Sequence, residues 1–517
     1  MSHHTTPAPV PDAGTTQRTS HGHGHHGQPA AHSHGAHHGA HEGAGEAETH
    51  RPWTILALML MAQFMVVLDV SVVNVALPSI GRSLSFSSGD YQWVVSAYVL
   101  LSGGLLLFGG RLSDLFDRRT MFLTGLSTFT IASLVSATAS SAATMILSRA
   151  AQGTGAAMLT PAALSIIVTT YTGKQRSTAL AIWGTIGSMG IAAGVLLGGI
   201  LTTTLGWRSI FFVNVPIGIV AAVLTLRTVA RNRNNGNHDG SRSLDVPGAI
   251  TLVTGVLAMV YAIESAGTHG WTSTQTILGS AISTVLLTAF WLIESHVPAP
   301  LVPPTTWKIR SLMSASTVMA VITGGIVGAI FVSSLFLQQV LGASPVIAGL
   351  EFLPLAASIT LGAAVASHVI GHVGPKHLMV VGLLVVATGA WLLAGVDANP
   401  SYLTDVLPGF IVLGLGTGPM FVAISIVAMS GIRHEQSGLA SGVMMTGHEV
   451  GAALGVASLT AIAGDLTTRT GLLDAYPTVF TAIAVAMVAL SVFAAFAVPN
   501  VKAPAGAGGH GHGHGMH

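Results

Sequence analysis

The chain has 517 residues, of which half are hydrophobic and only 8% carry a charge, and its net charge is close to zero. A soluble globular protein carries about a quarter charged residues, so this composition indicates an all-α polytopic membrane protein. Because the chain has no cysteine, disulfides and thiolate chemistry are excluded. The near-neutral charge gives no reason to expect a nucleic-acid partner.

Residues 1–50 are rich in His, Gly, Ala, Thr and Pro and hold 12 of the 24 histidines. Such a segment cannot bury enough apolar surface to fold alone, so we expect a disordered tail here and another at 500–517. Interspersed imidazoles can bind Zn²⁺, Ni²⁺ or Cu²⁺. The alternative is that both tails are solvated and dispensable. The candidate divalent-metal ligands are His21, His23, His25, His26, His510, His512 and His514.

Apolar runs of about 18–26 residues, each long enough to cross a bilayer as one helix, follow one another from Trp53 onward. We expect fourteen spans. They lie near 53–77, 91–110, 120–139, 142–167, 178–204, 208–226, 246–264, 275–294, 312–338, 347–370, 378–396, 403–427, 438–462 and 477–498.

The segments GRLSDLFDRRTMFLTGL and SHVIGHVGPKHLMVVGL can be aligned with Gly125 opposite Gly382, which suggests two related six-helix halves. Spans seven and eight would then be an insertion between the halves. The expected organisation is an N-terminal bundle at 51–230, a cytoplasmic linker at 231–245, two inserted helices at 246–295 and a C-terminal bundle at 296–499.

The distribution of Lys and Arg predicts the orientation. With the N-terminus inside, sixteen of these residues lie in inner loops and tails, and only Arg82, Arg208 and Arg469 lie in outer loops. Both histidine-rich tails are then cytoplasmic.

The first span, WTILALMLMAQFMVVLDVSVVNVALP, carries one charge, Asp69. At ~1.5 Å per residue, Asp69 lies about 24 Å from the start of the helix, past the midplane of the bilayer. A carboxylate there costs roughly 2.5–3.5 kcal/mol on insertion scales, so it should face the protein interior or an aqueous cavity and serve function. The alternative is a purely structural hydrogen bond to a neighbouring helix.

Arg149 lies within the fourth span, in SRAAQGTGAAMLTP, with Gln152 about one turn further on. An embedded guanidinium stays protonated and needs partners or water. It can also respond to the protonation of a nearby carboxylate. The alternative is that Arg149 snorkels to the cytoplasmic interface.

The short loop after the second span is charged, and we expect it to form a gate that latches one helical bundle to the other. Gly110 is expected to permit a close backbone approach, and Asp114 can pair with an arginine or cap a helix. The alternative for the arginines is the usual excess of positive charge on the cytoplasmic side. The gating residues are Gly110, Arg111, Asp114, Arg118 and Arg119.

Span five carries Gly190, Gly194, Gly198 and Gly199. The four-residue spacing places the first three along one helix face and predicts a tight contact with a neighbouring helix. Whether that contact changes during turnover or is simple packing stays open.

Span thirteen contains His448 and Glu449, well inside an apolar run. Adjacent residues point about 100° apart on a helix, so both are not expected to face the same cavity. Glu449 is the second candidate for a proton or cation site, and the alternative is an interhelical hydrogen bond. Three other glutamates near span ends are expected at the membrane interface: Glu264, Glu294 and Glu351.

The chain contains no phosphate-binding loop, no HExxH motif and no soluble domain large enough for a nucleotide site. We therefore expect neither an enzyme nor a cofactor, and the energy for pumping must come from an ion gradient. A proton that crosses 100 mV releases about 2.3 kcal/mol, which is enough to drive a modest antiport.

Residues 53–498 resemble the major facilitator superfamily, specifically its fourteen-helix drug:H⁺ antiporters. LDVSVVNVALP, with Asp69, Asn74 and Pro78, is similar to the signature of that branch. GRLSDLFDRR, RAAQGTGAA and GIAAGVLLGG resemble the loop, fourth-span and fifth-span motifs. GWRSIFFVNVPIG and LQQVLGASPVIAGLEFLP are also similar to fourteen-helix members.

The resemblance implies a major facilitator fold of two six-helix bundles with two extra central helices. It also implies that Asp69 is linked to protons or substrate, that Arg149 is linked to protons, and that span five sets the direction of exchange. The sequence departs from the family pattern at three places. Asp117 stands where a glycine is usual, Val195 stands where a proline is usual, and His448-Glu449 replaces a basic–polar pair.

The function predicted in this way is proton-coupled export of lipophilic drugs or antibiotics, cationic ones included, across the cytoplasmic membrane by alternating access. The expected partners are a small lipophilic molecule, protons and the lipid bilayer. One alternative is a dedicated exporter of a single antibiotic or metabolite, and another is a metal-ion-linked transporter that uses the histidine-rich tails. A non-transporting scaffold would leave the embedded Asp69, Arg149 and Glu449 unexplained.

Overall fold

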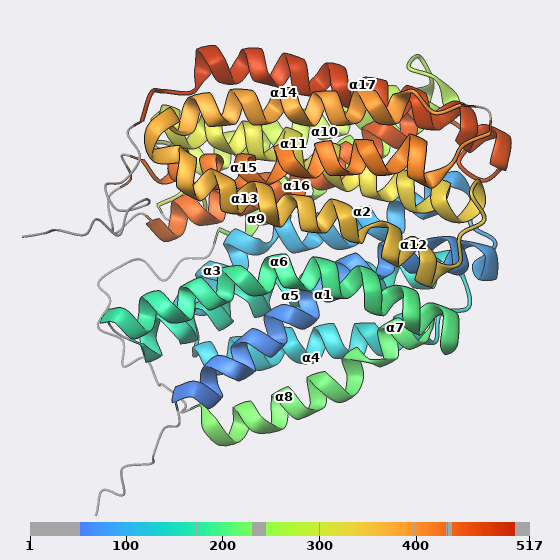
Figure 1. The fold of residues 1–517 in the computed structure, drawn as a ribbon. Coiled ribbons are helices and arrows are strands. Elements are labelled where there is room, and N and C mark those ends of the chain that lie inside the picture. Colours follow the sequence, from blue (N-terminus) through green and yellow to red (C-terminus); the bar gives the residue numbers. More distant parts are fainter. Residues whose placement is uncertain are drawn as a thin grey trace, which may run out of the picture. The chain divides into compact units, whose positions relative to one another are not determined.

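The computed structural model describes residues 52–171, 173–229, 245–298, 300–397, 399–430, 432 and 437–501, and the regular structure within them is entirely helical (Figure 1). The helices of the first part of the chain are α1 Pro52–Leu84, α2 Ser88–Gly104, α3 Leu106–Leu115, α4 Arg118–Ala137, α5 Ala142–Thr170, α6 Gly173–Thr204, α7 Ser209–Phe212 and α8 Asn214–Thr228.

The rest of the described chain is helical too. Its α-helices are α9 Val246–His269, α10 Thr274–His296, α11 Arg310–Gln339, α12 Pro345–Glu351, α13 Leu353–Val373, α14 Pro375–Ala394, α15 Leu407–Met429, α16 Ser437–Ala463 and α17 Arg469–Ala497. A 3₁₀-helix, η1 Thr306–Lys308, precedes α11, and a π-helix, η2 Tyr402–Val406, leads into α15.

Several helices begin where the sequence supplies a capping side chain. At the start of α2 the Ser87 hydroxyl accepts a hydrogen bond from the Asp90 N–H at 3.3 Å, and the Asp90 carboxylate accepts one from the Ser87 N–H at 2.8 Å. Asp117 and Ser141 cap α4 and α5 with their side-chain oxygens. These caps satisfy N–H groups that a helix start otherwise leaves without partners.

Eleven helices of the described part are long and apolar enough to cross a membrane, or twelve if the bent pair α2 and α3 forms one span. That pair bends by 41°. Helices α6 and α16 lie at the positions expected for spans five and thirteen. The count of fourteen spans and the boundaries between halves, linker and inserted helices stay predictions.

The two aligned segments of the sequence make equivalent contacts in space. A Cβ added at Gly125 of α4 would lie 2.8 Å from the carbonyl oxygen of Gly155 in α5. One added at Gly382 of α14 would lie 3.1 Å from the carbonyl oxygen of Gly416 in α15. Helices α4 and α5 therefore cross at the same point of their sequence as α14 and α15, as a repeat requires.

The first and last parts of the described chain meet along several helix pairs, among them α1 with α11, α2 with α16, and α6 with α12. Helix α9 packs against both α2 and α16, so it lies alongside that contact, and α10 packs against α9. The candidate residues of span one lie on α1, which also packs against α5, α6 and α8.

Candidate transport site

Asp69 lies in the middle of α1, and only 1% of its surface is exposed. Because α1 is covered by α5, α6 and α8, the carboxylate faces protein, as the cost of a charge in lipid requires. Polar side chains from three other helices converge on it.

Arg149 of α5 forms an ion pair with Asp69, in which its Nη1 donates to the carboxylate oxygen Oδ2. Nη1 also donates to Gln152 Oε1 at 2.9 Å, and Nε donates to the Val94 carbonyl at 3.3 Å. The ring of Tyr98 lies 4.2 Å from the guanidinium carbon, a cation–π contact. Since Arg149 is only 1% exposed, the alternative that it snorkels to the interface is wrong.

The second carboxylate oxygen of Asp69 accepts hydrogen bonds from two side-chain amides. Gln152 Nε2 donates to it at 3.1 Å, and Asn214 Nδ2 at 3.0 Å. The Ser133 hydroxyl of α4 accepts from the same amides, at 2.7 Å from Gln152 and 3.4 Å from Asn214. We call Asp69, Arg149, Gln152, Asn214 and Ser133 the Asp69 network.

Sequence reasoning missed Asn214 and Ser133. The signal for Asn214 was a lone amide in the apolar run FFVNVPIG, which says nothing about its partner. Ser133 carried no signal, because serine is common at the contacts between membrane helices.

The Asp69 network holds a charge pair out of water. Such a pair adds little stability, whereas the loss of one partner costs about 3–5 kcal/mol because the other charge is left uncompensated. The arrangement therefore links the charge of Asp69 directly to the side-chain contacts of Arg149.

Asn74, a predicted site residue, lies outside the Asp69 network. Its Nδ2 donates to the Val70 carbonyl of the same helix at 3.1 Å. The backbone carbonyl of Asn74 accepts a hydrogen bond from Ser334 Oγ of α11 at 2.5 Å, and the backbone carbonyl of Val75 accepts one from Gln338 Nε2 at 2.8 Å. Asn74 therefore lies where α1 meets α11, between one and two helical turns from Asp69.

Glu449 lies on α16 against α2, where a side chain added at Gly103 would overlap it. Its Oε1 lies 3.6 Å from His448 Nδ1, and the two side chains are 19% and 30% exposed, respectively. The two side chains lie close to each other, and the expectation that they do not face the same cavity stays a prediction. The ring of Phe421 lies 6.4 Å from the His448 ring.

The loop residues make local contacts. Arg119 Nη2 donates to the Leu226 carbonyl at the end of α8 at 2.9 Å, where the helix dipole favours a cation. Asp117, the departure from the usual glycine, caps α4 and accepts from the Thr120 N–H at 3.0 Å. Arg111 and Arg118 form no ion pair with the described side chains, and the side chain of Asp114 lies outside the described part. The gating role stays a prediction.

The close backbone approach expected at Gly110 is found at Gly109 instead. A Cβ at Gly109 would overlap the α5 backbone at Ala157, whereas at Gly110 the nearest atom is the Cβ of Pro161, 4.0 Å away. Successive residues are rotated by about 100° around a helix, so Gly109 faces α5 whereas the next residue, Gly110, points away from the close contact.

The glycines of α6 pack against α1, as their spacing predicted. Gly190, Gly194 and Gly198 each lie so close to α1 that an added Cβ would meet it. At Gly194 that Cβ would lie 2.6 Å from the Cβ of Ser71. The three contacts lie on both sides of Asp69 along α1.

Gly199 faces a different helix from the other three glycines. A Cβ there would lie 2.5 Å from the carbonyl oxygen of Pro345 at the start of α12, and one at Gly349 would lie 2.7 Å from the carbonyl oxygen of Val195. The end of α6 is therefore a contact with the second part of the chain. Val195, where a proline is usual, lies inside an unbroken α6.

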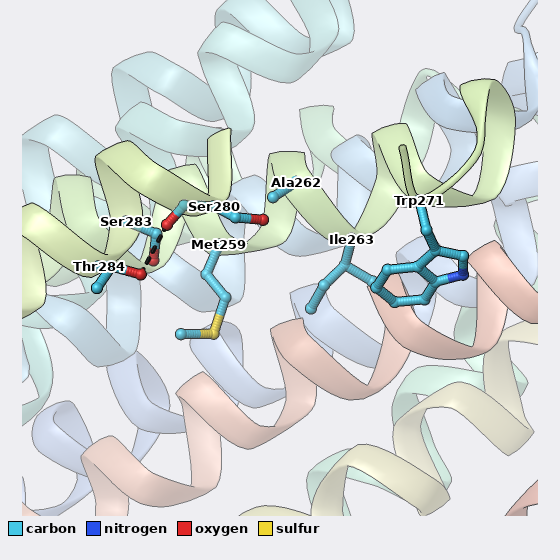
Figure 2. A pocket seen from close by; sticks show the side chains of 7 residues that line it. All are labelled: Met259, Ala262, Ile263, Trp271, Ser280, Ser283 and Thr284. Carbon is cyan, nitrogen blue, oxygen red and sulfur yellow. Dashed lines mark hydrogen bonds between the residues drawn. The ribbon is translucent and has the colours of Figure 1, made fainter. Parts of the chain in front are cut away.

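A hollow of about 190 Å³ lies between α9 and α10. Figure 2 shows the side chains that line it, with Trp271 at one end. The Thr284 hydroxyl donates to the Ser280 carbonyl at 2.8 Å, and Ser283 donates to the Gly255 carbonyl at 2.9 Å. The lining has no charged residue, and pockets for drug-sized ligands measure about 300–1,000 Å³. This hollow therefore does not qualify as the transport site.

Within the described ranges, no group of three or more His, Cys, Asp or Glu side chains is placed to hold a metal ion. The tail histidines predicted as metal ligands, His21, His23, His25, His26, His510, His512 and His514, lie outside those ranges.

The chain belongs to the Major Facilitator Superfamily, whose sequence model matches residues 59–456. The puromycin resistance protein of Streptomyces alboniger is 38% identical over 416 residues, which cover 80% of this chain and 82% of that protein. The cephamycin export protein of Amycolatopsis lactamdurans is 35% identical over 451 residues, with coverage of 86% and 92%. A multidrug resistance protein of Mycobacterium tuberculosis is 32% identical over 400 residues, with coverage of 77% and 73%.

Solved structures show the same fold. A peptide transporter crystallised with sulfate superposes with a TM-score of 0.60 at 14% identity, covering 85% of this chain and 93% of that one. A bacterial homolog of the human lysosomal transporter Spinster superposes with a TM-score of 0.59 at 19% identity, covering 87% and 96%. The predicted superfamily and its all-helical fold are confirmed, and the chain is a multi-span membrane transporter.

Proposed function

We propose that this transporter is a proton-coupled exporter of lipophilic drugs or antibiotics, cationic ones included. It would act in the plasma membrane with both termini in the cytoplasm. The excess of Lys and Arg in alternate loops supports this orientation. The relatives named for resistance to puromycin and for export of cephamycin support outward transport of antibiotics.

The buried ion pair of Asp69 and Arg149 is the observation that carries the proposal. Charged groups inside the membrane cost free energy, so an ion pair between the middle of α1 and α5 supports a functional role. Asp69 is the proton acceptor in this mechanism. When it takes up a proton, Arg149 keeps only its contacts with Gln152, the Val94 carbonyl and the Tyr98 ring.

Two contacts of α1 would carry this change outward. The glycines of α6 lie against α1 on both sides of Asp69, so a shift of α1 moves α6 as well. Ser334 and Gln338 of α11 bind α1 carbonyls next to Asn74. In the proposed orientation these bonds lie toward the outer side, and they must break for the transporter to open outward.

Glu449 is the proposed second carboxylate, with His448 beside it. Their side chains are partly exposed and belong to α16, which packs against α2 of the first half. A carboxylate in that position can attract a cationic substrate while apolar surface binds the rest of the molecule. Neither enzyme chemistry nor a cofactor is required, because the proton gradient supplies the energy.

Ethidium efflux from intact cells, with and without an uncoupler, tests the proposal when the parent is compared with Asp69→Asn. We expect uncoupler-sensitive efflux in the parent and its loss in Asp69→Asn, with efflux expressed per amount of transporter in the membrane. Asp397→Asn, which alters an exposed carboxylate, is the matched control and should transport normally. Normal efflux by Asp69→Asn would overturn the role of Asp69 and transfer it to Glu449.

A dedicated exporter of a single antibiotic is the second candidate. The relatives named for one compound each, such as tetracenomycin C in Streptomyces glaucescens, favour it. Cells that expel puromycin or tetracenomycin C but not ethidium would establish this narrower function. A role for the tails in metal-ion-linked transport rests on the sequence alone, and deletion of residues 1–50 and 505–517 tests it through metal tolerance with efflux intact.

A further inference from the structure

Helices α9 and α10 carry two buried carboxyl groups that take no part in the Asp69 network. Asp245 is the N-cap residue of α9, and Glu294 lies in the last turn of α10. Each has only 2% of its surface exposed. Glu294 was expected at the membrane interface, but the chain after α10 folds back over it.

Both residues bind backbone N–H groups. Glu294 Oε1 accepts from the Leu301 N–H at 3.2 Å, and Oε2 accepts from the Val302 N–H at 3.0 Å. Asp245 Oδ1 accepts from the Gly248 N–H at 2.7 Å. Asp245 Oδ2 is buried without a partner among the described residues, and it belongs to the N-cap residue of the helix that packs against α10, so the two carboxyl groups are close enough to interact electrostatically.

Two ionised carboxylates in this position would repel each other with little water to screen them. A single proton between them removes the repulsion and supplies the donor that Asp245 Oδ2 lacks, as in other paired carboxyl groups. We propose that Asp245 and Glu294 together bind one proton, at a site separate from the Asp69 network.

No positively charged group among the described side chains acts on Glu294. Of the described side chains, Asp245 is the one titratable group that acts on Glu294. The nearby His296 is exposed, and its Nδ1 lies 2.8 Å from the Leu292 carbonyl. The elements packed around residues 301–302 present the apolar side chains of Ala249, Leu107, Phe108 and Val443.

The shared proton has a structural consequence. Glu294 holds the N–H groups of Leu301 and Val302, and those two side chains pack against Leu107 and Phe108 of α3 and Val443 of α16. The pair therefore fastens the segment that leads to α11 onto the helix that carries the charged loop motif. Loss of the proton at alkaline pH would loosen this segment.

Thermal unfolding of the purified full-length protein, followed from mildly acidic to alkaline pH, tests the site independently of transport. If the native protein holds one proton more than the unfolded chain, its stability falls as the pH rises. We expect the melting temperature of the parent to fall over this range and that of Asp245→Asn to stay level. Asparagine still caps α9 and donates a hydrogen bond to Glu294 without needing the proton.

Asp397→Asn is the matched control, because it removes an exposed carboxyl group, and it should keep the pH dependence of the parent. A second readout is the infrared absorption of a protonated carboxyl group, which should be present in the parent at neutral pH and lost in both Asp245→Asn and Glu294→Gln. The same pH dependence in Asp245→Asn and the parent, or an unchanged infrared band, would overturn the site. If Glu294→Gln does not fold, Asp245→Asn decides alone.

Discussion

Two helix pairs, α1 with α6 and α11 with α16, pack alike but hold different chemistry. In each pair, glycines four residues apart on the second helix lie against the first. The glycines are Gly190, Gly194 and Gly198 on α6, and Gly447, Gly451 and Gly455 on α16. Tight contact through small residues is thus a property of both halves of the fold.

The charges differ between the pairs. Helix α1 holds Asp69, whose carboxylate has three side-chain donors, whereas α11 contains no acidic residue. In the second pair the carboxylate, Glu449, lies on the glycine-bearing helix and remains partly exposed. The comparison shows that the packing does not depend on the charge. In the first half, both oxygens of the Asp69 carboxylate are hydrogen-bonded and buried. In the second half, the Glu449 carboxylate is partly exposed to solvent.

Replacement of Arg149 by methionine should produce the largest effect. It leaves Asp69 ionised and buried without its partner, which costs about 3–5 kcal/mol. We expect a large fall in the melting temperature and loss of efflux. In the double variant Asp69→Asn/Arg149→Met the buried charge is gone, so most of the stability should return although efflux does not. Equal melting temperatures for the single and double variants would show that the pair is not coupled.

Asn214→Ala should have the next largest effect. A hydrogen bond to a charged group contributes about 1.5–3 kcal/mol, and Asn214 donates one to Asp69. The melting temperature should fall by less than in Arg149→Met, and efflux should weaken. The control is Ser283→Ala, which removes a buried hydrogen bond to the Gly255 carbonyl between α10 and α9 and leaves Asp69 untouched. Full efflux with Asn214→Ala would place this amide outside the coupling machinery.

The glycine contacts of both halves should be sensitive to an added side chain if the packing is shared. An added Cβ would lie 2.6 Å from the Cβ of Ser71 at Gly194, and it would overlap the Ala320 backbone at Gly451. Overpacking of this kind costs about 1–3 kcal/mol. Alanine at either position should therefore lower the melting temperature, more so at Gly451, where the backbone cannot rotate away.

Gly371→Ala is the control for these two variants. No atom lies within 4 Å of the Cβ it would add inside α13, so helix propensity should stabilise the protein by about 1 kcal/mol. An Ala at Gly194 that left both stability and efflux unchanged would mean that α6 does not need close contact with α1.

How far the sequence predicts this structure depends on how rare each signal is. Charged residues are rare in membrane spans, so the sequence identified Asp69 and Arg149 as candidate site residues. That each needs a partner follows because a single charge is not stable inside the membrane. The repeat at Gly125 and Gly382 was visible for a similar reason, since a glycine at a helix crossing tolerates no substitute.

Other features required the tertiary fold. The amide of Asn214 reaches Asp69 across 145 positions of sequence, and no local pattern encodes that distance. The choice between Gly109 and Gly110 depends on helix rotation, which a sequence motif does not specify. Glu294 is buried because residues 301–302 return over it, and its place near the end of a span did not predict that burial.

The smallest change in stability, and the sharpest test of the contrast between the pairs, is expected from single cysteines. Because the chain has none of its own, a thiol reagent reports only on the introduced position. Ser133→Cys tests the Asp69 network, in which the native serine is fully buried, and Glu449→Cys tests a side chain that is 19% exposed. A water-soluble reagent should label Glu449→Cys about tenfold faster than Ser133→Cys, because thiol reactivity follows exposure.

Asp465→Cys, in the exposed loop before α17, gives the upper limit of the labelling rate. Equal labelling rates at positions 133 and 449 would mean that water reaches the Asp69 network as freely as it reaches Glu449. The contrast between a buried carboxylate in one helix pair and a partly exposed one in the other would then be wrong.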